Sequence, residues 1–174
     1  MASIARCLRV ARPATVSRLA QAPVRSSWQS PSIRAFSMTA SREIRKYTKD
    51  HEWVDLNADK TSGVIGISSY AAEELGDVVY VELPEADKTV AAGDAIGAVE
   101  SVKSAADINA PITCTVTDVN LVLEEKPSQI NAVPEDDSHG GGWICKVAVD
   151  EQGVQDFEKL MSAEEYKAFT GDEH

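Results

Sequence analysis

The sequence predicts a mainly β domain, a sandwich or flattened barrel, with one short internal helix and a helical C-terminus. Short runs rich in Val, Ile and Thr recur from Tyr47 onward, and Pro, Gly and Asn residues separate them. Helix-favouring segments interrupt this pattern once and return after Val149. The chain has 174 residues, which suits one domain of this kind with tails.

Seven segments have the composition of half-buried or buried strands, where β-branched side chains pack well. They are residues 52–56, 63–67, 77–83, 95–102, 107–108, 113–119 and 143–149. The Pro and Gly residues between them bend the chain or remove a hydrogen-bond donor, and either effect ends a strand. Many short strands with such breaks are typical of a sandwich or barrel.

Helices are predicted near the middle and at the end of this series. Residues 68–75 combine a serine cap with good helix formers, and Gly76 follows as a stop. Near the C-terminus, four apolar residues share one helical face: Val154, Phe157, Leu160 and Met161. Residues 162–165 match a capping box that begins another helix. The segment 124–142, rich in Pro, Ser and acidic residues, is predicted to be a long surface loop.

The N-terminal segment differs in charge from the rest of the chain. Residues 1–42 contain seven arginines and no acidic residue, so all 28 Asp and Glu residues follow them. This Arg-rich and Ser-rich composition, without a continuous apolar stretch, is typical of an organellar transit peptide. We therefore predict a mitochondrial transit peptide over 1–43, removed or disordered, and a matrix protein formed by 44–174. A basic tail that binds nucleic acid or anionic lipid is the alternative interpretation.

Several classes of function lack support in the remaining sequence. No stretch approaches the apolar length of a membrane span, and the His and Cys residues lack the spacing of metal ligands. No pairing of a nucleophile with a base indicates a hydrolase. Cys114 and Cys145 lie in apolar runs and are predicted to be buried free thiols. We expect no metal, no membrane partner and no nucleic-acid partner.

Lys103 lies at a reversal between two predicted strands, in the segment GAVESVKSAADIN. A lysine at the tip of a hairpin is exposed, and it ordinarily keeps a sheet from pairing with another sheet. Local composition alone therefore gives Lys103 no special role.

Six separated segments together resemble the H proteins of glycine cleavage systems. In chain order they are YTKDHEW, LGDVVYVELPE, GD at 93–94, GAVESVKS, VN at 119–120 and GW at 142–143. The resemblance covers residues 45–169. It implies a barrel-sandwich hybrid of the lipoyl/biotinyl type, with lipoic acid in amide linkage to Lys103.

The resemblance also implies a carrier with no catalytic activity of its own. Such a carrier takes the aminomethyl group of glycine from glycine decarboxylase, the P protein, and passes it to aminomethyltransferase, the T protein. Dihydrolipoamide dehydrogenase, the L protein, then reoxidises the lipoyl dithiol, so the cofactor supplies the chemistry. A lipoyl-attaching enzyme is the fourth implied partner, and Glu100 matches a position that helps it to recognise the lysine.

A surface cleft that shelters the loaded lipoyl arm is a further implication of the resemblance. Glu52 and Asp107 match positions that line this cleft, and carboxylates suit a cationic amine. Asp50 stands where the family commonly has Ser, so the family pattern departs there. We interpret His51, beside Trp53 at the start of a strand, as structural rather than as a proton-transfer residue.

Two alternatives stay open at this point. An H-like protein that hands its lipoyl group to other acceptors, or that acts in regulation, needs the same lysine and the same ligase surface. A lipoyl domain of a 2-oxoacid dehydrogenase complex is the other, but Lys103 lacks the Asp-Lys-Ala flanks of those domains. It also lacks the Met-Lys-Met flanks of biotinyl carriers.

Overall fold

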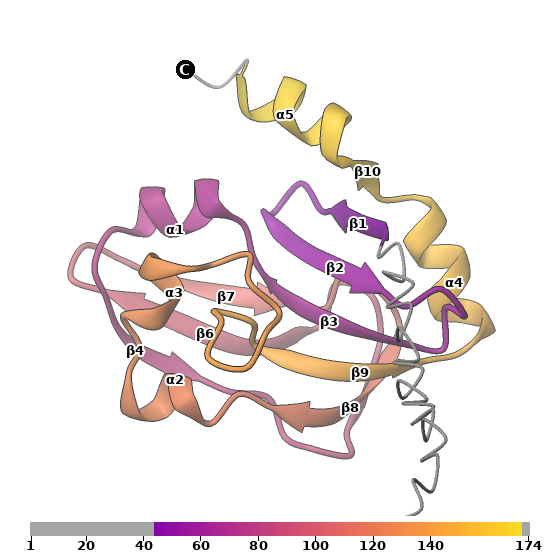
Figure 1. The fold of residues 1–174 in the computed structure, drawn as a ribbon, viewed down its shortest axis with the longest axis horizontal. Coiled ribbons are helices and arrows are strands. Elements are labelled where there is room, and N and C mark those ends of the chain that lie inside the picture. The colour runs from indigo at the N-terminus through magenta and orange to yellow at the C-terminus, as the bar shows by residue number, and fades with distance from the viewer. Residues whose placement is uncertain (1–43, 172–174) are drawn as a thin grey trace, which may run out of the picture. The chain divides into compact units, whose positions relative to one another are not determined.

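Two antiparallel sheets with short helices outside them form the domain in the computed structural model, which describes residues 44–171 (Figure 1). The predicted transit peptide at 1–43 lies outside the described residues. The strands are β1 (Ile44–Tyr47), β2 (Glu52–Leu56), β3 (Ser62–Ile67), β4 (Val78–Glu82), β5 (Thr89–Val90), β6 (Ala95–Ser101), β7 (Ala105–Asn109), β8 (Cys114–Val119), β9 (Cys145–Val149) and β10 (Met161–Ser162). The helices are α1 (Ser69–Leu75), α2 (Val122–Glu125), α3 (Gln129–Ala132), α4 (Glu151–Glu158) and α5 (Ala163–Gly171).

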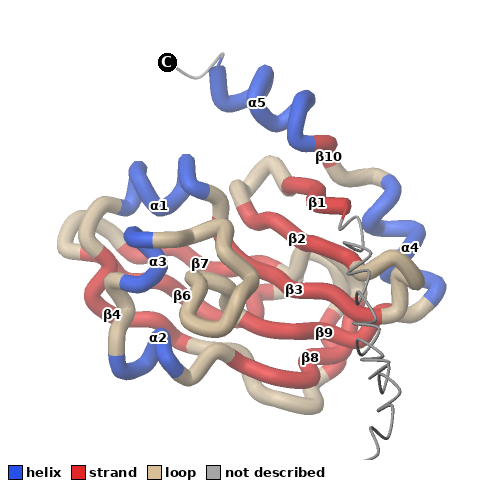
Figure 2. The backbone as a smooth tube through the Cα atoms, in the orientation of Figure 1, coloured by secondary structure: helices blue, strands red, loops and turns tan. Residues whose placement is uncertain are grey.

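The larger sheet has seven strands in the order β10-β1-β2-β3-β9-β8-β5, and the smaller has three in the order β4-β6-β7. Figure 2 shows α1, α2 and α3 beside the smaller sheet, whereas α4 and α5 lie beside β1 and β10. A continuous apolar core includes Leu56, Ile65, Val99, Ile108 and Val147, which come from both sheets. This arrangement confirms the predicted mainly β barrel-sandwich fold.

All seven predicted strands are present, with ends shifted by a few residues. Strands β1, β5 and β10 escaped prediction because two to four residues are too few to show an alternating pattern. These three strands are defined by the strands with which they pair. Strand β1, which reads IRKY, pairs with β2 through Tyr47 and Trp53 and with β10 through Tyr47 and Met161.

The prediction of a long surface loop over 124–142 was wrong in part, because this stretch contains the end of α2 and the whole of α3. Leu123 and Ile130 are fully buried, so each single-turn helix is fixed to the core by one apolar side chain. One anchor per turn gives no helical periodicity in the sequence, and this explains the error.

The predicted helix caps are confirmed. The Ser68 hydroxyl accepts a hydrogen bond from the Ala71 amide at 3.1 Å, at the start of α1. At the start of α5 the capping box forms in both directions. The Ser162 amide donates to the Glu165 carboxylate at 2.8 Å, and the Glu165 amide donates to the Ser162 hydroxyl at 3.3 Å.

An aromatic cluster holds helix α5 against the start of the domain. It consists of Tyr47, Trp53, Trp143 and Tyr166. The rings of Tyr47 and Tyr166 stack with their centroids 4.3 Å apart, and the Trp53 indole donates to the Ile67 carbonyl at 2.8 Å. Helix α5 is therefore fixed beside β1 and the loop that leads into β2.

Both cysteines of the described domain are buried free thiols, as predicted. Burial raises the pKa of Cys114 to about 11 and also raises the pKa of Cys145. Within residues 44–171 no three His, Cys, Asp or Glu side chains gather in a way that could hold a metal ion. None of the described helices is long and apolar enough to cross a bilayer.

Candidate functional site

Lys103 lies in the tight turn between β6 and β7, and Ser101 closes this turn. The Ser101 amide donates to the Ser104 carbonyl at 2.8 Å. The Ser101 hydroxyl accepts from the amides of Lys103 at 3.1 Å and Ser104 at 3.0 Å. These hydrogen bonds fix the backbone that carries Lys103, so a flexible side chain stands on a rigid base.

A glycine supports the same hairpin from the middle of β6. A Cβ atom at Gly97 would lie 2.2 Å from the Glu82 carbonyl oxygen on β4. Only glycine at this position lets β4 approach β6 this closely. The close approach of the two strands explains the glycine of the GAVESVK segment.

The Lys103 side chain is exposed and extends over the end of α1. A Cβ atom at Gly76, which ends that helix with a φ of 74°, would lie 3.1 Å from Lys103 Cε. Within residues 44–171 the Lys103 ammonium forms no ion pair or hydrogen bond. The amine is thus accessible to a reagent or an enzyme without the loss of a protein contact.

We expect Gly76→Ala to lower the free energy of unfolding by about 1–3 kcal/mol, because a φ of 74° with a ψ of −151° suits glycine alone. The new methyl group also displaces Lys103. Gly93→Ala is the matched control, since Gly93 has a φ of 87° but no heavy atom within 4 Å of its Cβ position. Urea unfolding of both variants measures the backbone cost. The NMR signal of the Lys103 ε-methylene group should shift in Gly76→Ala and not in Gly93→Ala. Equal shifts in the two variants contradict the contact between position 76 and Lys103.

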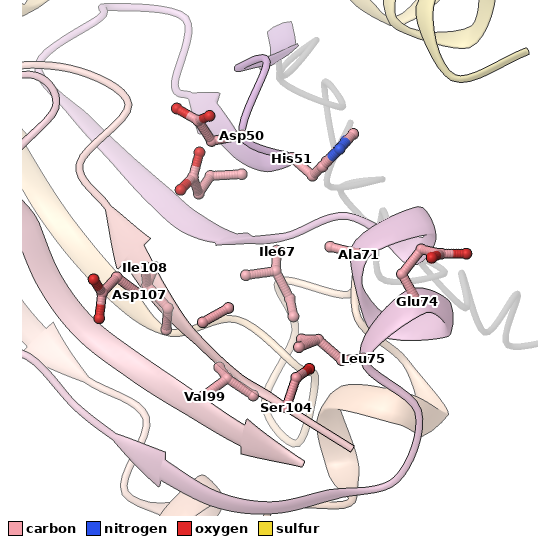
Figure 3. A pocket seen from close by; sticks show the side chains of 12 residues that line it. Asp50, His51, Ile67, Ala71, Glu74, Leu75, Val99, Ser104, Asp107 and Ile108 are labelled. Carbon is pink, nitrogen blue, oxygen red and sulfur yellow. The ribbon is translucent and has the colours of Figure 1, made fainter. Parts of the chain in front are cut away.

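A cleft of about 320 Å³ opens beside the hairpin. Its apolar lining is Ile67, Ala71, Leu75, Val99, Ala106 and Ile108, and its polar lining is Asp50, His51, Glu52, Glu74, Ser104 and Asp107. Figure 3 shows Ile67, Leu75 and Val99 between the carboxylates of Asp107 and Glu74. The cleft therefore joins an apolar centre to an acidic border.

The three carboxylates that the resemblance implies, Asp50, Glu52 and Asp107, all line this cleft. Sequence reasoning missed Glu74 and Leu75, because they lie on α1 and enter the cleft only through tertiary packing. Lys103 itself is not a lining residue, but the next residue, Ser104, is. A group attached to Lys103 would need to bend at the turn to enter the cleft.

Glu52 differs from the other carboxylates because it is only 2% exposed. Its carboxylate accepts a hydrogen bond from the Asn109 amide at 3.0 Å and another from the Thr48 hydroxyl. Asp50 and Asp107 are exposed. Glu52 thus ties β7 to the start of β2, and the exposed pair is available to a ligand.

His51 forms one wall of the cleft, and other residues fix its position. Its Nδ1 lies 2.8 Å from the Tyr166 hydroxyl, which also lies 2.7 Å from the Ser68 hydroxyl. The His51 backbone has a φ of 72°. These contacts favour the structural interpretation of His51. Helix α5, through Tyr166, therefore positions part of the cleft.

Glu100 lies outside the cleft. It is exposed on β6 and pairs with Tyr80 on β4, whereas the next pair, Val99 and Val81, is buried. Glu100 therefore points away from the cleft, on the outward face of the smaller sheet.

A barrel-sandwich with an exposed lysine on a rigid turn, next to an acidic cleft with an apolar centre, has the architecture of the lipoyl/biotinyl class of domains. The sequence model of the glycine cleavage H-protein family matches residues 45–173. The chain belongs to this family, and the resemblance noted from the sequence is confirmed.

Several relatives share this similarity over most of their length. A Schizosaccharomyces pombe protein named as a mitochondrial glycine cleavage system H protein is 44% identical over 129 residues, which are 74% of this chain and 72% of that protein. The glycine cleavage system H protein of Phenylobacterium zucineum is 48% identical over 124 residues, 71% of this chain and 96% of that protein. The crystal structure of the H protein from Mycobacterium marinum has a TM-score of 0.61 at 37% identity and covers 73% of this chain and 96% of its own.

Proposed function

We propose that this chain is the lipoyl carrier of a glycine cleavage system, with lipoic acid in amide linkage to Lys103. The observation that carries the proposal is the position of Lys103, exposed at a rigid turn beside the cleft. The relatives described above are each named as a glycine cleavage system H protein, which favours this function over an oxoacid dehydrogenase domain or an H-like relay.

The residues around Lys103 fit a lipoyl group. Acylation removes the charge of an amine that has no ion-pair partner among residues 44–171, so it costs the described fold no salt bridge. The apolar centre of the cleft, Ile67, Leu75 and Val99, suits an alkyl chain, and about 320 Å³ is the size of a small-molecule pocket. When bound, the lipoyl group supplies a disulfide that opens to accept a one-carbon unit.

The chain itself binds, orients and shields the lipoyl arm and its aminomethyl cargo. Asp107, Asp50 and Glu74 place negative charge where a cationic aminomethyl cargo would lie, and the apolar centre excludes water there. The carrier would receive this cargo from glycine decarboxylase and deliver it to aminomethyltransferase, and dihydrolipoamide dehydrogenase would restore the disulfide. The chain supplies positioning in this cycle and has no turnover of its own.

We expect Asp107→Asn to shorten the lifetime of the aminomethyl cargo on the isolated carrier roughly two- to tenfold, because one exposed, screened charge next to the amine is lost. Release of formaldehyde and ammonia from the loaded carrier measures the lifetime. Asp59→Asn is the control, since it removes one charge from an exposed turn outside the cleft. Equal lifetimes in the two variants contradict a role for Asp107.

Mass spectrometry of the protein from mitochondria of its source organism tests the proposed function. We expect one lipoyl increment on the peptide that contains Lys103. We also expect the residues before about Ile44 to be missing, as for an imported matrix protein with a removed transit peptide. An unmodified Lys103 in a processed chain would overturn the carrier function.

A further inference from the structure

Half of the exposed large apolar side chains lie at the lysine turn or on the strand joined to it. Within residues 44–171, six large apolar side chains are exposed: Ile44, Val79, Tyr80, Val102, Leu121 and Val122. Two of them lie on β4 and one is the residue before Lys103. Leu121 and Val122 lie at the start of α2, which contacts β4. Ile44 lies on β1, so three of the six, Val79, Tyr80 and Val102, lie on β4 or directly before Lys103.

Val79, Tyr80 and Val102, here called the hairpin patch, are 54%, 53% and 68% exposed. The Val102 amide donates to the Asp77 carbonyl at 3.1 Å, which joins the turn to the start of β4. The register of β4 against β6 shifts between Val78 and Tyr80, and this irregularity contains Val79. The patch therefore spans the tip of the hairpin and the strand next to it.

Acidic residues frame the hairpin patch. Asp77, Glu82 and Glu100 are all exposed, and Glu100 pairs directly with Tyr80. From residue 61 to residue 102, Lys88 is the only basic residue. A protein that covers this patch should therefore present an apolar surface bordered by Lys or Arg.

We propose that the hairpin patch is the docking surface for the enzyme that attaches the lipoyl group to Lys103, an inference that rests on the proposed function. In that reaction the Lys103 amine gives up a proton and forms an amide with the carbonyl carbon of an activated lipoyl donor, whose leaving group departs. The enzyme must bring this donor to Lys103 Nζ, so its surface closes around the turn and meets Val102.

The other proposed partners of the carrier need not close around the lysine turn. They act on the sulfur atoms at the far end of a long flexible tether, and this tether separates them from the turn. Tyr80 and Glu100 also lie on the face of the smaller sheet opposite to Val99, which lines the cleft. An enzyme that binds the hairpin patch therefore leaves the cleft open for the newly attached arm.

The test compares the unmodified wild-type carrier with a Tyr80→Ser, Val102→Ser double variant and with Ile44→Ser. Ile44 is 45% exposed, so its variant is the control for loss of an exposed apolar side chain outside the patch. Calorimetry measures the Kd for a lipoate-protein ligase, and intact mass measures the rate of lipoylation. We expect a roughly 10- to 100-fold weaker Kd and lower kcat/KM for the double variant, and less than a twofold change for Ile44→Ser. Thermal melting checks that both variants are folded.

The outcomes separate this inference from the function on which it rests. If wild type is lipoylated at Lys103 and the double variant binds the ligase equally well, the docking surface is wrong and the carrier function stands. If wild type is never lipoylated, the proposed function itself fails. The double variant, once it has been lipoylated with excess ligase, should support glycine decarboxylation by glycine decarboxylase as well as wild type does. Impaired coupling with normal ligase binding would instead assign the patch to the decarboxylase.

Discussion

Lys103→Arg is expected to abolish lipoylation and all carrier activity while the fold stays intact. The guanidinium group keeps its proton in proteins and is not an acyl acceptor, although it keeps the positive charge of lysine. Lys103 is exposed and its side chain makes no polar contact within residues 44–171, so the free energy of unfolding should not change measurably. Intact mass after incubation with a ligase, and glycine decarboxylation coupled to the carrier, are the two measurements.

Lys88→Arg is the matched control for this prediction. Lys88 is also an exposed lysine in a loop between strands, and its nearest partner is the Glu85 carboxylate at 3.9 Å. This variant should be lipoylated and active like wild type. A lipoyl increment that persists in Lys103→Arg, or disappears in Lys88→Arg, would show that the acceptor has been assigned to the wrong lysine.

Glu52→Ala is expected to cause the largest loss of stability among the variants of the cleft, about 2–4 kcal/mol in the free energy of unfolding. The buried carboxylate accepts from the Asn109 amide and the Thr48 hydroxyl, and both donors lose this acceptor in the variant. Strand β7 should loosen as a result. Urea unfolding measures the stability, and hydrogen exchange of the Asn109 amide reports the local effect.

Two further variants separate the structural role of Glu52 from its charge. Glu52→Gln keeps an oxygen that can accept from the Asn109 amide, so it should recover most of the lost stability. Asp107→Ala removes an exposed carboxylate from the same cleft and should leave the midpoint of unfolding near that of wild type. If Glu52→Ala lowers the free energy of unfolding no more than Asp107→Ala does, Glu52 does not hold β7 to β2.

Much of the fold could be predicted because its strands are chemically distinctive. The runs at 63–67 and 113–119 contain β-branched residues that fit a sheet, and the caps at Ser68 and Ser162 follow from local hydrogen bonds. The missed elements depend on distant partners instead. Strand β1 has a polar sequence and exists because it pairs with β2 and β10.

The candidate site was predictable only in part. Nothing local distinguishes Lys103 from any other hairpin lysine, so its proposed role comes from the separated segments that resemble the family. The resemblance also named Asp50, Glu52 and Asp107, which the fold brings to one cleft. Glu74 and Leu75 were missed, since no pattern in α1 reveals which residues of a helix face a cleft formed with β6 and β7.

The strand order affects how the protein folds while it is being synthesised. Strand β9 lies between β3 and β8, and β1 meets β10, so the larger sheet joins residues from both ends of the described domain. While the ribosome is still making the segment after Val119, neither β3 nor β8 has the neighbour that lies between them in the finished sheet. Sheets that depend on such distant pairings close late and slowly. The nascent chain should therefore stay open until synthesis is nearly complete, in a state that can still be threaded through a narrow pore.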